Sequence, residues 1–131
     1  MSISVTVAAT QSMGAALATA IGASSTIKIY SGSKPATPET GATGTLLVTV
    51  AISGSFTSSS GALTAADPAA ASPAASGTAG YFRLATSGGT AILDGTVTAT
   101  GGGGDMTLGS TTISTGVNVD LGVPTITVPV A

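Results

Sequence analysis

The sequence predicts a mainly β protein, an antiparallel β-sandwich or barrel with one short N-terminal helix. Short runs in which apolar and polar residues alternate recur along the 131 residues, and this period of two is typical of half-buried strands. The runs are separated by turn-forming residues, with 19 Gly and 6 Pro in the chain. Only one segment has apolar residues at helical spacing. The length fits one domain, residues 1–131.

The N-terminal segment predicts a strand and then the helix. Alternation over Ser2–Val7 predicts a half-buried strand. Thr10 or Ser12 is expected to cap the helix, and Gly22 to end it. The segment lacks the basic start of a signal peptide, so we expect no cleaved leader, and its apolar run is too short to span a membrane. The predicted buried face of the helix is Met13, Ala16, Leu17, Ala20 and Ile21.

The middle of the chain predicts strands of unequal strength. In the clearest of them, Ile27 and Ile29 point inward while Lys28 and Tyr30 point outward. Pro and Gly mark the intervening loops. The expected elements are a strand at Thr26–Tyr30, an exposed loop at Ser31–Gly44, a strand at Leu46–Ile52, a weak strand at Ala62–Ala65 and a long loop that ends at Gly77.

Residues 79–95 predict a β-hairpin. Gly88 and Gly89 suit a two-residue turn, which makes Ser87 face Thr90. The resulting register places Tyr81 opposite Thr96, Phe82 opposite Gly95, Arg83 opposite Asp94, and Leu84 opposite Leu93.

The same register separates a core face from an exposed face. The ring of Phe82 can cover the bare backbone of Gly95. On the exposed face the only Arg of the chain meets a carboxylate, where such a pair contributes at most about 1 kcal/mol and mainly selects the register. The core face is expected to hold Phe82, Leu84, Ala91 and Leu93, and the exposed face Tyr81, Arg83, Ile92 and Asp94.

The C-terminal third predicts short strands between Gly-rich breaks. Pro124 interrupts the alternation, so the last strand is expected to bend there and to lie at a sheet edge. The expected elements are a flexible connection at Gly101–Asp105, strand fragments at Met106–Leu108 and Thr112–Ile113, a strand at Val117–Val123 and a final edge strand at Thr125–Val130.

The composition disfavours several functional classes. Charged residues make up only 6% of the chain, against about a quarter in typical soluble proteins. Three scattered basic residues and a formal charge of −2 argue against nucleic-acid binding. Cys and His are absent, which removes thiolate chemistry, the usual general base and the commonest metal ligands. A surface with so little charge suits a protein packed in an assembly.

No motif predicts a chemical site. The acids Glu39, Asp67, Asp94, Asp105 and Asp120 share no metal-binding spacing. The glycine run at residues 101–104 is not followed by the Lys and Ser/Thr of a phosphate-binding loop, and no serine lies in a nucleophile-elbow motif. We therefore expect no catalytic residue, no metal and no cofactor.

Three stretches resemble a family of small structural proteins of tailed bacteriophages. They read KIYSGSKPATPETGATGTLL, SGTAGYFRLATSGGTAILDGTV and GGDMTLGSTTISTGVNV. The resemblance extends from Ser25 to the C-terminus. It implies a head or decoration-type virion protein with a short N-terminal helix and a GTAGYFR hairpin.

The resemblance and the composition together predict a capsid decoration (cement) protein on the outside of the virion. It would form a homo-oligomer and stabilise the assembled head by bridging major capsid protein subunits, with no nucleic-acid or membrane partner. Residues 1–9 and 123–131 are candidate partner-contacting arms, because terminal strands can pair with a neighbour's sheet edge, and the loop Ser31–Gly44 is a third candidate contact. The alternatives are a tail-tube, neck or fibre subunit, or a surface carbohydrate-binding or adhesive β-module.

Overall fold

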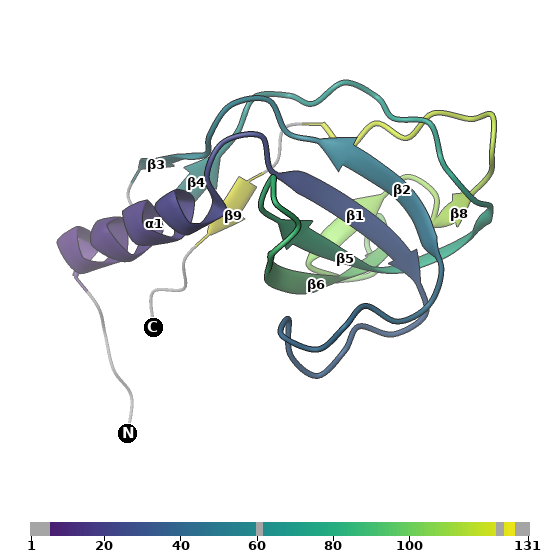
Figure 1. The fold of residues 1–131 in the computed structure, drawn as a ribbon, viewed down its shortest axis with the longest axis horizontal. Helices are drawn as coiled ribbons and strands as arrows, with labels where there is room; N and C mark the ends of the chain where they lie inside the picture. Colours follow the sequence, from purple (N-terminus) through teal and green to yellow (C-terminus); the bar gives the residue numbers. More distant parts are fainter. Residues whose placement is uncertain (1–5, 60–61, 123–124, 128–131) are drawn as a thin grey trace.

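The fold was determined as a computed structural model that describes residues 6–59, 62–122 and 125–127. The predicted class is confirmed: the chain is mainly β, with one N-terminal helix and a curled sheet that forms a half-barrel (Figure 1). The elements are α1 (Val7–Ile21), β1 (Thr26–Ser31), β2 (Leu46–Ala51), β3 (Thr57–Ser59), β4 (Ala62–Thr64), β5 (Gly77–Ala85), β6 (Ala91–Ala99), β7 (Met106–Leu108), β8 (Thr112–Ile113) and β9 (Thr125–Thr127).

The strands of the described residues form two sheets. The main sheet has the order β2-β1-β5-β6-β7, and β8 pairs with the start of β5. The small sheet has the order β3-β4-β9, and α1 packs against β3 and β4 at one end of the molecule (Figure 1). The pairing is antiparallel except between β6 and β7, which are parallel. The predicted antiparallel arrangement is thus present, with one parallel pair at this edge.

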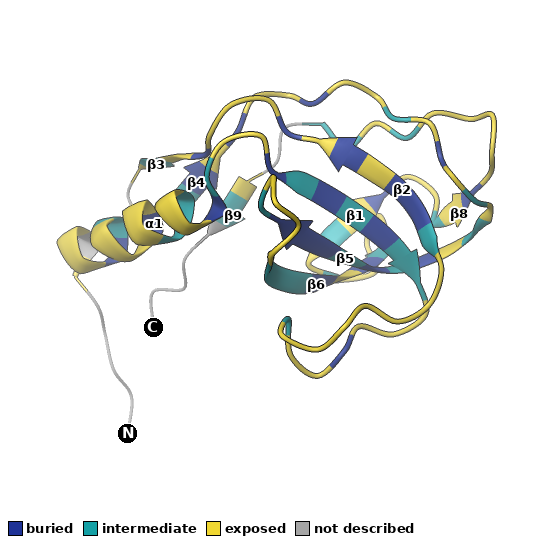
Figure 2. Ribbon diagram, in the orientation of Figure 1, coloured by how far each residue is buried: buried dark blue, intermediate teal, exposed yellow. Residues whose placement is uncertain are grey.

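The apolar face of the main sheet forms the core. Ile27 of β1 lies between Val50 of β2 and Leu84 of β5, and Ile29 lies two residues further along β1 on the same face. All four of these side chains are buried (Figure 2). The predicted strands at residues 26–30 and 46–52 and the inward orientation of the two isoleucines are confirmed, because β-branched residues at a period of two suit a half-buried strand.

The helix begins earlier than predicted and buries a different face. Thr6, not Thr10 or Ser12, caps it: the Thr6 hydroxyl accepts a hydrogen bond of 3.1 Å from the backbone N–H of Ala9. Val7, expected at the end of a strand, is already helical, and the rest of the Ser2–Val7 prediction lies mostly outside the described residues. Gly22 ends the helix as predicted, with φ +72°.

The contact with β3 explains which helix face is buried. Thr10, Gly14 and Ile21 are buried, and Leu17 is half-buried. Gln11 donates a hydrogen bond of 3.0 Å from Nε2 to the carbonyl of Ser58. The helix is rich in alanine on every side, so the spacing of its apolar residues does not single out one face. Three of the predicted core positions, Met13, Ala16 and Ala20, are exposed.

The hairpin of β5 and β6 has the predicted register but a different turn. All four predicted cross-strand pairs are present. The turn, however, has Ser87 and Gly88 at its centre: Thr86 donates to the carbonyl of Thr90 at 2.9 Å, and Gly89 has φ +93°. The loop is thus one residue longer than predicted.

A register shift beside Leu84 compensates for the longer loop. Ala85 pairs with Ala91, while Leu84 pairs with Leu93, so Ile92 is the extra residue of an irregularity in β6. Ile92 packs against the hydrophobic core. Its predicted place on the exposed face, beside Asp94, is therefore wrong.

The glycine run between β6 and β7 is held against β6 at some of its residues, so it is not a simple linker. Asp105 and Gly104 hydrogen-bond back to Thr96 and Thr98 of β6. A Cβ on Gly102 would lie 2.7 Å from the Cβ of Thr98. The six residues that connect the parallel strands β6 and β7 therefore fold back along β6.

The remaining strand predictions have mixed outcomes. The fragments at residues 106–108 and 112–113 are confirmed, as is the weak strand, which spans Ala62–Thr64. Thr57–Ser59 was not predicted, because Ser and Thr alone produce no apolar alternation. The strand over Val117–Val123 is wrong in its described part: only Val119 forms a bridge, with Ala71. The Asp120 carboxylate accepts a hydrogen bond of 3.0 Å from the backbone N–H of Gly122. Such a bond favours a turn at residues 120–122 in place of an extended strand.

Candidate interaction surfaces

The polar face of the hairpin holds a shielded ion pair. Arg83 Nε and Nη2 donate to the two carboxylate oxygens of Asp94 at 2.7 and 2.8 Å, a bidentate geometry. The side chains are only 9% and 2% exposed, so the expectation of an exposed pair is wrong. The hydrogen bonds to Asp94 raise the pKa of Arg83 above its ordinary value.

The loop at residues 31–44 covers this pair and is held at two points. Arg83 donates to the carbonyl of Thr40 at 2.9 Å. The hydroxyl of Tyr81 donates to the carbonyl of Thr43 at 2.6 Å and accepts from its N–H at 2.9 Å. The loop was expected to be exposed, and most of its residues are, but Pro35 is buried. It therefore presents a surface of defined shape.

The two tyrosines reinforce the covered face. The rings of Tyr30 and Tyr81 stack with centroids 5.1 Å apart and planes 9° from parallel. Tyr81 is fully buried, and burial is the main cause that raises the pKa of Tyr30. Neither ring is an open platform on the surface.

The candidate arms are described only in part. Residues 7–9 belong to α1, so this part of the N-terminal arm is helical. Residues 125–127 form β9, which pairs with β4 of the same chain, and Ile126 packs against the core. Residues 1–5, 123–124 and 128–131 lie outside the described residues. The partner-contacting role of the arms stays a prediction.

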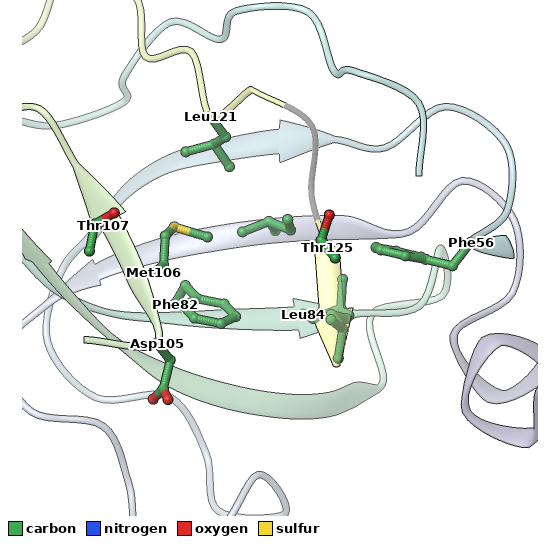
Figure 3. A pocket seen from close by; sticks show the side chains of 10 residues that line it. Phe56, Phe82, Leu84, Asp105, Met106, Thr107, Leu121 and Thr125 are labelled. Carbon is green, nitrogen blue, oxygen red and sulfur yellow. The ribbon is translucent and has the colours of Figure 1, made fainter. Parts of the chain in front are cut away.

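An apolar pocket opens on the other face of the main sheet. It has a volume of about 250 Å³. Figure 3 shows Phe82 between the strand that carries Met106 and Thr107 and the strand that carries Thr125. The lining residues are Ile27, Phe56, Phe82, Leu84, Asp105, Met106, Thr107, Leu121, Thr125 and Ile126.

Asp105 lies at the edge of this pocket with its carboxylate held in place. Its Oδ2 accepts hydrogen bonds from the backbone N–H of Thr96 at 2.9 Å and from the Thr96 hydroxyl at 3.0 Å. These two bonds lower the pKa of Asp105 below its ordinary value of 3.8. Asp105 is therefore a fixed negative charge beside an apolar hollow at neutral pH.

The acidic residues considered as metal ligands are not brought together in the described part of the chain. Within residues 6–59, 62–122 and 125–127, no group of three or more acidic side chains is placed to hold a metal ion. Across the same ranges no helix has the length and apolarity needed to cross a bilayer. The structure thus groups side chains into a shielded polar face and an open apolar pocket.

Sequence reasoning did not identify the pocket. Its residues come from β1, β5, β7, β9 and the loops around Phe56 and Leu121, and no local spacing relates them. The only usable signal was the pairing of Phe82 with Gly95, which places a large ring beside bare backbone.

Comparisons with protein-family models, with curated proteins and with solved structures find no match to this chain.

Proposed function

We propose that this chain is a structural subunit of a tailed-bacteriophage virion, namely a capsid decoration protein on the outside of the head. It bridges major capsid protein subunits in several copies. Because it binds the assembled state and not the separated subunits, mass action favours assembly. The role requires shape and contact area and no catalytic group.

The observation that carries the proposal is how little charge remains on the surface. The chain has three basic and five acidic residues, and Arg83 and Asp94 are consumed by their shielded ion pair. A protein that remains dispersed normally has a densely charged surface, which prevents association. The surface charges that remain are Lys28, Lys34, Glu39, Asp67, Asp105 and Asp120.

The held loop at residues 31–44 adds support. A contact surface that is rigid before binding loses less conformational entropy when it binds. The anchoring of Thr40 and Thr43 to the hairpin provides such rigidity in a segment without secondary structure. A cement protein needs such a surface, because it must fit the same junction many times over one particle.

The adhesive alternative is less favoured because the aromatic side chains are already engaged. Sugar-binding surfaces use exposed rings as stacking platforms. Here Tyr81 and Phe56 are buried, Tyr30 stacks on Tyr81, and Phe82 covers Gly95. A tail-tube, neck or fibre subunit remains the second candidate, since the same low surface charge suits any packed station in a virion.

The test uses the phage that encodes this chain. Particles that lack the protein should assemble but should release DNA at lower temperature or under milder osmotic shock than wild type. Purified protein added back to these particles should restore their resistance. An image reconstruction of the virion should place the chain on the head exterior.

Two outcomes would contradict the proposal. Density for this chain in the tail or neck would move the assignment to the second candidate. Particles without the protein that are as robust as wild type would exclude a cementing role.

A further inference from the structure

The apolar pocket is lined by the last strand of each sheet. The main sheet ends at β7 and the small sheet ends at β9, and within the described ranges no strand pairs with the second edge of either. Met106 and Thr107 of β7 and Thr125 and Ile126 of β9 line the pocket (Figure 3). Strand edges carry unpaired backbone N–H and C=O groups, which can pair with an added extended segment.

The pocket itself suits one large apolar side chain. Its volume is about 250 Å³, and its walls include Ile27, Phe82 and Leu84 from the sheet and Phe56 and Leu121 from loops. For scale, an apolar cavity of roughly 150 Å³ accommodates benzene. A Leu, Met or Phe side chain would therefore fit into the pocket and remove part of its apolar walls from water.

A second hollow beside the pocket is negatively charged. It has a volume of about 340 Å³ and shares Phe82, Asp105, Thr125 and Ile126 with the pocket. Asp94 also lines it, but its charge is paired with Arg83.

Asp105 thus supplies the unpaired charge, and no Lys or Arg is among the described residues that line either hollow. Thr96 bonds to Oδ2 only, and in the described part of the chain no hydrogen bond engages Oδ1. The positive charge of Lys34 contributes to lowering the pKa of Asp105, but the two side chains form no ion pair among the described residues.

We infer that this pair of hollows receives an extended segment of a neighbouring subunit, with a large apolar residue and a Lys or Arg two positions along. Residues i and i+2 of an extended chain lie on one face, about 7 Å apart. The apolar side chain enters the pocket, and the cation reaches Asp105 in the second hollow. The inference rests on the proposed function only for the source of the segment, another virion subunit.

The test titrates the full chain, labelled for NMR, with the synthetic peptide acetyl-Thr-Thr-Leu-Thr-Arg-Thr-Thr-amide. Binding is expected with a dissociation constant below about 1 mM. The largest shift changes are expected at Met106–Leu108 and Thr125–Thr127. The control peptide has the same composition with Leu and Arg adjacent, which places them on opposite faces. It should bind about tenfold more weakly or worse.

Two variants of the protein separate the two contacts. Leu121→Trp fills the pocket and should abolish binding, whereas Val117→Trp, at an exposed position that does not line it, should have no effect. Asp105→Asn keeps an oxygen to accept from Thr96 but loses the charge. It should weaken binding of the Arg peptide about fivefold or more, and should leave a peptide with Gln in place of Arg unaffected.

Three results would overturn the inference: no binding up to about 1 mM peptide, equal affinity for the two peptide isomers, or binding that Leu121→Trp does not weaken. The particle assay separates this failure from failure of the proposed function. Particles fully stabilised by the Leu121→Trp protein would exclude the pocket and leave the decoration role standing. If the chain binds the peptide but is absent from the head exterior, the pocket inference stands and the decoration role is excluded.

Discussion

The two faces of the β5–β6 hairpin are closed in different ways. On one face, Arg83, Asp94 and Tyr81 are covered by the loop at residues 31–44 through directional hydrogen bonds. On the other, Phe82 and Leu84 face apolar side chains from both sheets, and a hollow of about 250 Å³ remains. The polar face is sealed, and the apolar face is left partly open.

The difference shows that a buried ion pair requires closely fitted neighbours, whereas apolar contacts do not. A buried ion pair is costly unless each donor and acceptor is satisfied, so the loop must fit Thr40 and Thr43 closely against the strands. Apolar contacts are individually weak and non-directional, so an apolar face tolerates incomplete covering. We therefore expect the sealed face to determine stability and the open face to be available for binding.

The largest expected effect comes from breaking the ion pair. Arg83→Met leaves the Asp94 carboxylate shielded without a partner and should lower the free energy of unfolding by about 3–5 kcal/mol, measured by urea denaturation. The double variant Arg83→Met/Asp94→Leu should recover most of this loss, because it removes both charges. A loss below about 1 kcal/mol for the single variant would show that the face is not sealed.

A substitution that adds a methyl group beside Phe82 tests the apolar face of the hairpin. A Cβ on Gly95 would lie 2.6 Å from Cζ of Phe82, so Gly95→Ala must displace the ring. The expected loss is about 1–3 kcal/mol in the same denaturation assay. Gly88→Ala is the matched control, since its Cβ would meet only the Thr86 hydroxyl oxygen at 3.8 Å. Equal stability of the two variants would mean that the ring moves into the pocket freely.

Removal of one hydroxyl tests the loop anchor. Tyr81→Phe deletes both hydrogen bonds to Thr43 and should cost about 1–2 kcal/mol. Amide hydrogen exchange at Thr43 should become faster. Tyr30→Phe is the control, because its hydroxyl forms no hydrogen bond within the described residues. Unchanged exchange at Thr43 in Tyr81→Phe would argue against anchoring through this hydroxyl.

The smallest effect concerns Asp105 and pH. Its pKa is lowered below 3.8 in the folded chain, so the folded state binds its proton less readily than the unfolded state does. The resulting stabilisation is complete well above pH 3.8 and is lost as the pH falls through the folded pKa. Stability of wild type should therefore fall more steeply than that of Asp105→Asn below about pH 4. Parallel curves would contradict the hydrogen bonds to Thr96.

Local sequence patterns are enough to predict most strands of the main sheet and the register of the central hairpin. Alternation placed Ile27 and Ile29 in the core, and the hairpin pairing of Arg83 with Asp94 followed from where the glycines lie, although the turn is one residue longer. Gly22 marked the end of the helix. These features depend on residues close together in the chain, and short-range preferences and steric limits are readable from local patterns.

What covers each face of the sheet depends on tertiary packing. The covering loop meets the hairpin through Thr43 and Tyr81, 38 positions apart, and the buried side of α1 is chosen by β3. The pocket forms where Phe82 of β5 meets residues of β7 and β9, which belong to different sheets. Alternation specifies which side chains share a face but not what covers them, because that depends on packing between segments with no sequence relation to one another.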